Sequence, residues 1–337
     1  MNAAVSPTTA LRDALNHALL KCCRGLPATI QSRAILFLIQ DSGKPWPGAF
    51  DYFQRYYPAC YSGLLWMNLR APAPLAAQAP AWRAAIEALA TAMALHRIDD
   101  HLVDGELGLS HMLLQLRTRL WSRYEEACAA IAGGSQELRT ESVARYFAAI
   151  DARNCPPSVP AFRARFVDQA ATWTLPLLLS ARAMGYTKTI IDAARQLYEA
   201  LAVALRYIDD LKDWQADVAQ GSLSGAIYLL LDHPKGRAQW RDASAQPSPA
   251  GRTTPELDRF RIERDTAVNA RGSANCGPSI LVEALHRKLR EDQVLEQALE
   301  NANREISTAM NLALELNWPE LAADLADVRS DWKSRHA

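Results

Sequence analysis

Apolar residues recur at intervals of three and four along almost the whole chain, with polar residues between them. This spacing is typical of helices that turn one side toward a core. No run of alternating β-branched residues flanked by tight turns predicts a hairpin. Clusters of glycine and proline, as at 25–27, 45–48 and 156–160, divide the pattern into separate helices. The sequence therefore predicts an all-α fold.

One long polar stretch interrupts the helical pattern. Residues 233–255 are rich in Ser, Pro, Gly and Arg, a composition typical of loops. The segments on both sides are again helical in pattern, so we expect a flexible loop or lid here rather than a linker. A length of 337 residues fits one large domain or two small ones. We expect a single helical bundle over 1–337, with about 1–24 as an N-terminal extension.

Composition narrows the class of protein. Hydrophobic residues make up 49% of the chain, charged residues 22%, and 37 basic residues balance 37 acidic ones. This balance predicts a globular protein and argues against nucleic acid as a partner, because phosphate binding favours a basic excess. The six cysteines form no Cys-x-x-Cys pair. With no signal peptide or long apolar run, we expect a cytoplasmic protein without a transmembrane segment.

An acidic cluster continues the apolar pattern of a helix that begins near Pro80. At 3.6 residues per turn, one stripe of this helix carries in succession Trp82, Ile86, Leu89, Met93, Asp100 and Asp104. Two carboxylates would then extend the side that faces the core, with Asp99 turned aside.

A second acidic cluster repeats this arrangement. The sequence Leu-Arg-Tyr-Ile-Asp-Asp at 205–210 echoes Leu-His-Arg-Ile-Asp-Asp at 95–100, and an apolar stripe again leads into acids at four-residue spacing, Asp209, Asp213 and Asp217. Like charges at this spacing destabilise a bare helix. An exposed acidic face is the alternative interpretation of either cluster alone. For both together, we expect a cation between the two clusters.

The ligand chemistry of the clusters favours a hard cation. Neither cluster carries a His or Cys pair, and Mg²⁺ typically takes one or two carboxylates and fills its remaining positions with water and phosphate oxygens. The sequence therefore predicts a Mg²⁺ site, which Mn²⁺ could also fill, and a phosphorylated substrate.

Together these residues resemble the paired metal motifs of the class I isoprenoid synthases. The segments 99–104 and 209–217, Asp-Asp-His-Leu-Val-Asp and Asp-Asp-Leu-Lys-Asp-Trp-Gln-Ala-Asp, are similar to the motifs that hold Mg²⁺ in terpene cyclases, trans-prenyl diphosphate synthases and squalene or phytoene synthases. The resemblance implies a helical bundle that ionises an isoprenyl diphosphate with loss of pyrophosphate. It implies metal ligands among Asp99, Asp100, Asp104, Asp209, Asp210, Asp213 and Asp217.

Details of the motifs indicate which branch of this superfamily the sequence resembles. The spacing of Asp209, Asp213 and Asp217 is similar to a cyclase metal motif, and the Gly-Lys-x-x-Arg-Pro and Arg-Arg-Gly segments of chain-elongating synthases do not occur. Gly105-Glu106 stands at the position where Arg-Arg-Gly would follow the first acidic motif. We therefore expect a terpene synthase, a lyase that cyclises its substrate. A prenyltransferase joining isoprenoid units is the alternative, and a non-catalytic prenyl-binding protein the second alternative.

Further residues are candidates for the substrate. The resemblance implies a diphosphate-sensing arginine 46 residues before Asp209, which is Arg163, and we assign it a catalytic role. Beside the second cluster lie Arg206, Tyr207 and Lys212, which could touch diphosphate oxygens, and Trp173 could line a cavity for the cation. The resemblance is also compatible with a homodimer.

Overall fold

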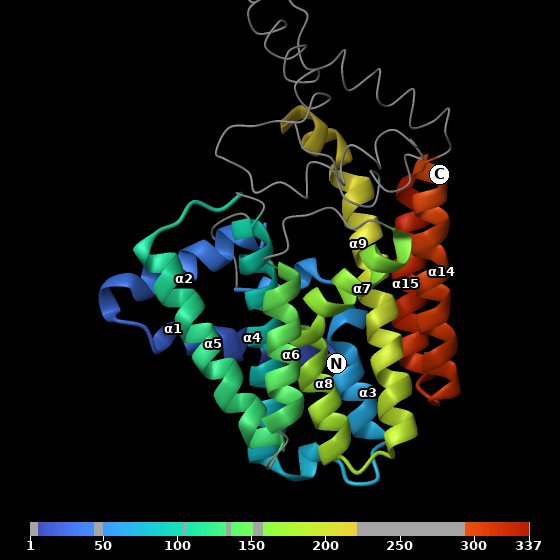
Figure 1. The fold of residues 1–337 in the computed structure, drawn as a ribbon. Helices are drawn as coiled ribbons and strands as arrows, with labels where there is room; N and C mark the ends of the chain where they lie inside the picture. Colours follow the sequence, from blue (N-terminus) through green and yellow to red (C-terminus); the bar gives the residue numbers. More distant parts are fainter. Residues whose placement is uncertain are drawn as a thin grey trace, which may run out of the picture. The chain divides into compact units, whose positions relative to one another are not determined.

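The computed structural model describes residues 6–43, 50–103, 106–132, 136–150, 158–220 and 294–336. Within these ranges the regular elements are all helices, so the expectation of an all-α fold is confirmed (Figure 1). The chain divides into two compact units. Unit 1 comprises 1–151, 167–201 and 306–337, and unit 2 comprises 152–166 and 202–305. The expected loop over 233–255 lies outside the described residues.

The described elements are α-helices and 3₁₀ turns. Three short 3₁₀ turns, η1 (Tyr52–Arg55), η2 (Pro58–Cys60) and η3 (Leu75–Ala77), accompany the α-helices. The α-helices are α1 (Pro7–Arg24), α2 (Ala28–Asp41), α3 (Ser62–Leu69), α4 (Ala79–Val103), α5 (His111–Ala132), α6 (Gln136–Ile150), α7 (Val159–Gln169), α8 (Ala171–Ala183), α9 (Lys188–Gln220), α14 (Val294–Glu315) and α15 (Pro319–His336).

Helix α4 is the core helix of unit 1. All its residues from Ala84 to Leu95 are buried, and it contacts α1, α5 and α8. A helix that is apolar on all sides is enclosed by its neighbours, and the run of alanines between 84 and 94 allows those neighbours to approach closely. The acidic cluster at 99–104 therefore begins where this enclosed helix ends.

Helix α1 belongs to this core as well. Ser6 caps the helix by accepting a hydrogen bond from the Thr9 N–H at 3.1 Å. Leu15, Leu19 and Cys23 are fully buried, and the helix packs on α4. Most of the segment that we expected to extend from the bundle is thus packed within unit 1.

The C-terminal helix of unit 1 is tied to segments more than 250 residues earlier. Asp324 of α15 accepts hydrogen bonds from the Ser62 hydroxyl and from the Trp66 indole N–H, at 2.5 and 3.0 Å. Tyr57 donates to Asp331 at 2.8 Å. Trp318 and Trp332 are almost completely buried. These contacts anchor α15 on η2 and α3.

In unit 2, the described helical residues belong to parts of α7, α9 and α14. Phe162 of α7 lies against Tyr207 of α9, with ring centroids 5.2 Å apart. Arg163 pairs with Glu305 of α14, with 3.0 Å between Nε and Oε1. The aromatic contact thus connects α7 to α9, and the ion pair connects α7 to α14. None of the described helices in either unit combines the length and the apolar character that a membrane crossing needs.

We predict that Gly63→Ala destabilises the protein. A Cβ atom at Gly63 would lie 1.4 Å from the hydroxyl oxygen of Tyr198, so α3 would have to move away from α9. Overpacking of a tight core contact costs about 1–3 kcal/mol in free energy of unfolding. Urea denaturation followed by circular dichroism measures the difference. Gly108→Ala is the control, because its Cβ would meet no atom within 4 Å; equal stability of the two variants would contradict the prediction.

Candidate functional site: the two acidic motifs

The first acidic motif lies at the C-terminal end of α4, and its two adjacent aspartates have different surroundings. Asp99 is only 4% exposed, whereas Asp100 is partly exposed. The expectation that Asp100 continues the buried side of the helix is therefore wrong. The buried side runs through Leu95 and Ile98 to Asp99, because neighbouring helices enclose α4 more widely than a single stripe. Asp104 lies outside the described residues.

Three donors from two neighbouring helices hold the Asp99 carboxylate. Arg117 of α5 donates to both oxygens, through Nε to Oδ1 and through Nη2 to Oδ2, the latter at 2.9 Å. Tyr146 of α6 donates its hydroxyl to Oδ2 at 2.7 Å. Burial, and next the charge of Asp99, raise the pKa of Tyr146 well above its ordinary value, so this hydroxyl remains a donor. The carboxylate is thus fully engaged by protein groups.

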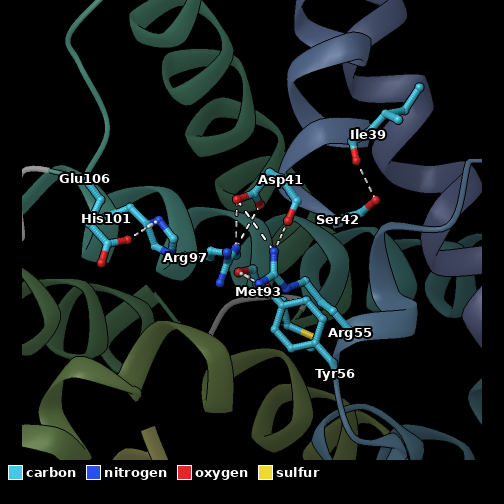
Figure 2. Close-up of polar contacts among 9 residues, drawn as sticks. All are labelled: Ile39, Asp41, Ser42, Arg55, Tyr56, Met93, Arg97, His101 and Glu106. Atoms are coloured by element: carbon cyan, nitrogen blue, oxygen red, sulfur yellow. Dashed lines mark hydrogen bonds and ion pairs between the residues drawn. The ribbon is translucent and has the colours of Figure 1, made fainter. Parts of the chain in front are cut away.

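A second ion-pair cluster lies beside the same end of α4 (Figure 2). Asp41, at the end of α2, accepts hydrogen bonds from Arg97 Nε at 3.0 and 2.8 Å. Arg55 donates to the Asp41 carbonyl oxygen and lies 3.7 Å from its carboxylate. The Asp41 carboxylate therefore faces two guanidinium groups. One of them belongs to Arg97, which lies three residues before Asp100 on α4. One turn further along α4, His101 pairs with Glu106 at 2.8 Å.

The second acidic motif lies on the C-terminal half of α9 and shows the same division. Asp209 is exposed over 53% of its side chain, and Asp210 over 2%. Asp213 is exposed and shares a side of the helix with Asp209, as the four-residue spacing predicts. This shared side faces solvent, so the expectation that it continues the apolar stripe is wrong. The side chain of Asp217 lies outside the described part.

Arg206 neutralises the buried acid of the second motif. Its Nε lies 2.9 Å from Oδ1 of Asp210, one helical turn away. Its guanidinium also lies over the ring of Phe166, 4.9 Å from the centroid, a favourable cation–π distance. The predicted diphosphate contact of Arg206 thus competes with this ion pair.

The other predicted substrate residues have varied surroundings. Lys212 is exposed beside Asp213. Tyr207 is 3% exposed, and burial, followed by Glu305, raises its pKa. Arg163 is 40% exposed and pairs with Glu305. Trp173 is buried in unit 1 and donates its indole N–H to the Cys60 carbonyl at 3.1 Å, so packing accounts for its position.

Sequence analysis missed Arg117, Tyr146 and Asp41. Arg117 and Tyr146 lie 18 and 47 residues from Asp99, and Asp41 lies 56 residues from Arg97. No local spacing connects such residues. The burial of an acid at the end of an apolar helix is itself a signal that a cation must be nearby, although it does not say which helix supplies it.

The accessible carboxylates suit a magnesium ion. Asp100, Asp209 and Asp213 offer oxygen atoms that solvent reaches, and carboxylate oxygen is the ligand type that Mg²⁺ prefers. Among the residues with described positions, no three Asp, Glu, His or Cys side chains converge to form a complete metal site.

Comparisons with known proteins identify the fold. No protein-family model matches the chain, and no curated protein matches it. Heptaprenyl diphosphate synthase from Staphylococcus aureus matches with a TM-score of 0.63 and 14% identity, over 99% of this chain and 100% of that one. Geranylgeranyl pyrophosphate synthase from Corynebacterium glutamicum, complexed with calcium and isoprenyl diphosphate, matches with 0.63 and 14%, over 98% of both chains. A polyprenyl synthetase from Streptomyces coelicolor A3(2) matches with 0.59 and 15%, over 96% and 99%. The chain therefore has the all-α isoprenoid synthase fold, as the motifs predicted.

We predict that Asp41→Asn lowers the free energy of unfolding by about 1–3 kcal/mol. The substitution removes the negative charge that strengthens the hydrogen bonds from Arg97 and leaves the guanidinium groups of Arg97 and Arg55 facing each other. Chemical denaturation measures this change. The control is Asp192→Asn on α9, an acid paired only with surface Lys188 and Arg195 among the ion pairs described, for which we expect less than about 0.5 kcal/mol. Equal effects in both variants would contradict the prediction.

Proposed function

We propose that this protein is a prenyltransferase, which removes pyrophosphate from an allylic isoprenyl diphosphate with the help of Mg²⁺ and joins the allylic unit to a second isoprenoid. The observation that carries this proposal is the pair of acidic motifs with accessible carboxylates at the end of α4 and on α9. It gains support from full-length likeness to isoprenyl diphosphate synthases, one of which was crystallised with calcium and isoprenyl diphosphate.

The acidic residues would hold the metal ions. We assign this role to Asp100, Asp104, Asp209, Asp213 and Asp217, because oxygen ligands suit Mg²⁺. Bound Mg²⁺ stabilises the negative charge that develops on the departing pyrophosphate. Arg163 and Lys212 carry positive charge on exposed side chains and would orient the diphosphate. Arg163 would exchange Glu305 for the substrate in doing so.

The reaction balances without a further reactant. The carbon–oxygen bond of the allylic diphosphate breaks, and its electron pair leaves with pyrophosphate. The double bond of the second unit supplies the electrons of the new carbon–carbon bond, and the proton lost from the adjacent carbon passes to the released pyrophosphate. The helical interior excludes water, which would otherwise capture the cation. A cytoplasmic location and a homodimer are part of this proposal.

Cyclisation to a terpene is the second candidate function. It is favoured by Gly105-Glu106, which stands where chain-elongating synthases carry Arg-Arg-Gly. Glu106 also pairs with His101, so this position presents a carboxylate in place of two arginines. Such a change would weaken a binding site for a second diphosphate. The two functions differ in whether one or two isoprenoid substrates are required.

Product analysis separates these functions. The purified protein is incubated with Mg²⁺ and C10, C15 or C20 allylic diphosphates, with and without isopentenyl diphosphate, and pyrophosphate release and products are measured by mass spectrometry. We expect elongated diphosphates only when isopentenyl diphosphate is present. Hydrocarbons or alcohols from one diphosphate alone would instead establish the cyclase. Binding without pyrophosphate release under any condition would contradict both enzymatic functions.

We predict that Asp100→Asn and Asp209→Asn each reduce the rate of pyrophosphate release by about 100-fold or more, because the loss of a metal ligand removes several kcal/mol of charge stabilisation in the transition state. Thermal stability is expected to remain, since both side chains are accessible to solvent. Asp192→Asn on the same helix as Asp209 serves as control and retains activity. A fully active Asp209→Asn enzyme would contradict the metal assignment.

A further inference from the structure

Each acidic motif contains two adjacent aspartates, and in each one aspartate is buried while its neighbour is accessible. In unit 1 the buried acid is Asp99 and the accessible one is Asp100. In unit 2 the buried acid is Asp210, 2% exposed, and the accessible one is Asp209. Adjacent helical residues point about 100° apart, so both members of a pair cannot face the same ion in the same way.

The buried acid of the first motif has little capacity left for a metal. A carboxylate has about four lone-pair positions, and Arg117 and Tyr146 occupy three of them. The Arg117 guanidinium also lies 5.9 Å from the centroid of Trp121, whose ring packs against Tyr146 at 5.8 Å. A divalent cation on Asp99 would have to displace a held arginine, whose like charge repels it.

The buried acid of the second motif also pairs with an arginine, but this arginine belongs to the same helix, α9, one turn earlier. Arg206 pairs with Asp210 and lies over Phe166. In both motifs an arginine that contacts an aromatic ring neutralises one carboxylate. In the first motif the ion pair joins α4 to α5. In the second the ion pair lies within α9, where Arg206 also lies 3.8 Å from Oδ2 of Asp209, and the ring of Phe166 connects Arg206 to α7.

We propose that Asp99 and Asp210 are positioning residues rather than metal ligands. Asp99, through Arg117 and Tyr146, holds the turn of α4 from which Asp100 binds a metal ion, and Asp210, through Arg206, holds the turn of α9 from which Asp209 binds one. This inference rests on the proposed function, because it assigns roles within the same site. It removes Asp99 and Asp210 from the ligand set that the motifs alone predict. It also assigns Arg206 to Asp210 instead of to the substrate diphosphate.

The test compares the two members of each pair as Asn variants in the full-length protein, together with Tyr146→Phe. Two quantities are measured. One is the melting temperature without metal, and the other is the number and affinity of Mn²⁺ ions bound in the presence of inorganic pyrophosphate, followed by electron paramagnetic resonance. If Asp99→Asn fails to fold, Tyr146→Phe still tests the inference, because it removes a single hydrogen bond from Asp99.

The two classes of variant should behave differently. For Asp99→Asn and Asp210→Asn we expect a lower melting temperature and the wild-type number of Mn²⁺ ions, bound about 10- to 100-fold more weakly, as for other residues that orient ligands. Tyr146→Phe should weaken Mn²⁺ binding less. For Asp100→Asn and Asp209→Asn we expect an unchanged melting temperature and fewer bound ions.

A buried ion pair elsewhere on α4 provides the matched control. Glu87 is buried and paired with Arg123 of α5 at 2.6 Å, three helical turns before the motif. Glu87→Gln should lower the melting temperature like Asp99→Asn and leave Mn²⁺ affinity at the wild-type value. This control separates loss of stability from loss of positioning.

Four results would overturn the inference. A reduced number of Mn²⁺ ions in Asp99→Asn or Asp210→Asn would make these residues ligands. Asp99 and Asp210 would have a purely structural role if their Asn variants bound Mn²⁺ with wild-type affinity. The same would follow if Glu87→Gln lost as much affinity as these variants. A wild-type protein that binds no Mn²⁺ with pyrophosphate would instead contradict the proposed function, and this assignment with it.

Discussion

Two buried carboxylates on α4 must each meet a positive charge, and the packing of unit 1 depends on this requirement. Glu87 and Asp99 lie 12 residues apart on a helix that its neighbours enclose. Helix α5 supplies Arg123 for the first and Arg117 for the second. Because a buried charge without a partner is strongly destabilising, these two pairs fix the register and antiparallel direction of α4 against α5. The interface of the two helices is thus electrostatic at both ends and apolar between.

The same requirement shapes the acidic motifs. A site that gathers several carboxylates has to limit their mutual repulsion before any metal arrives. Here Arg117 and Arg206 neutralise the buried acids Asp99 and Asp210, whereas the neighbouring Asp100 and Asp209 keep part of their surface in solvent. A protein built in this way can fold without metal and still offer oxygen ligands at the motifs. The ion pairs of Asp41 with Arg97 and Arg55 add a further charged layer at the end of α4 (Figure 2).

Low identity with a shared fold has a physical explanation. The compared synthases share 14–15% of residues with this chain over almost its full length. A helical bundle is maintained by apolar spacing and close packing, which many sequences satisfy. Chemistry depends on fewer positions, and there the chain departs from chain-elongating synthases, as at Gly105-Glu106. For the proposed activity, the choice between joining and cyclising isoprenoids therefore depends on site residues and not on the fold.

The sequence by itself determined the all-α fold, the existence of both acidic motifs and the oxygen character of the candidate metal ligands, because helical periodicity and residue type are local properties. It also placed Asp209 and Asp213 on one side of a helix, since four-residue spacing is sufficient for that. Tertiary structure decided which aspartate of each pair is buried. Periodicity assigned Asp100 and Asp209 to the core, whereas packing buried Asp99 and Asp210. For α4 the reason is that a helix enclosed on all sides has no single apolar stripe. The partners that make this burial possible, Arg117 and Tyr146, come from other helices, and only folding brings them to Asp99.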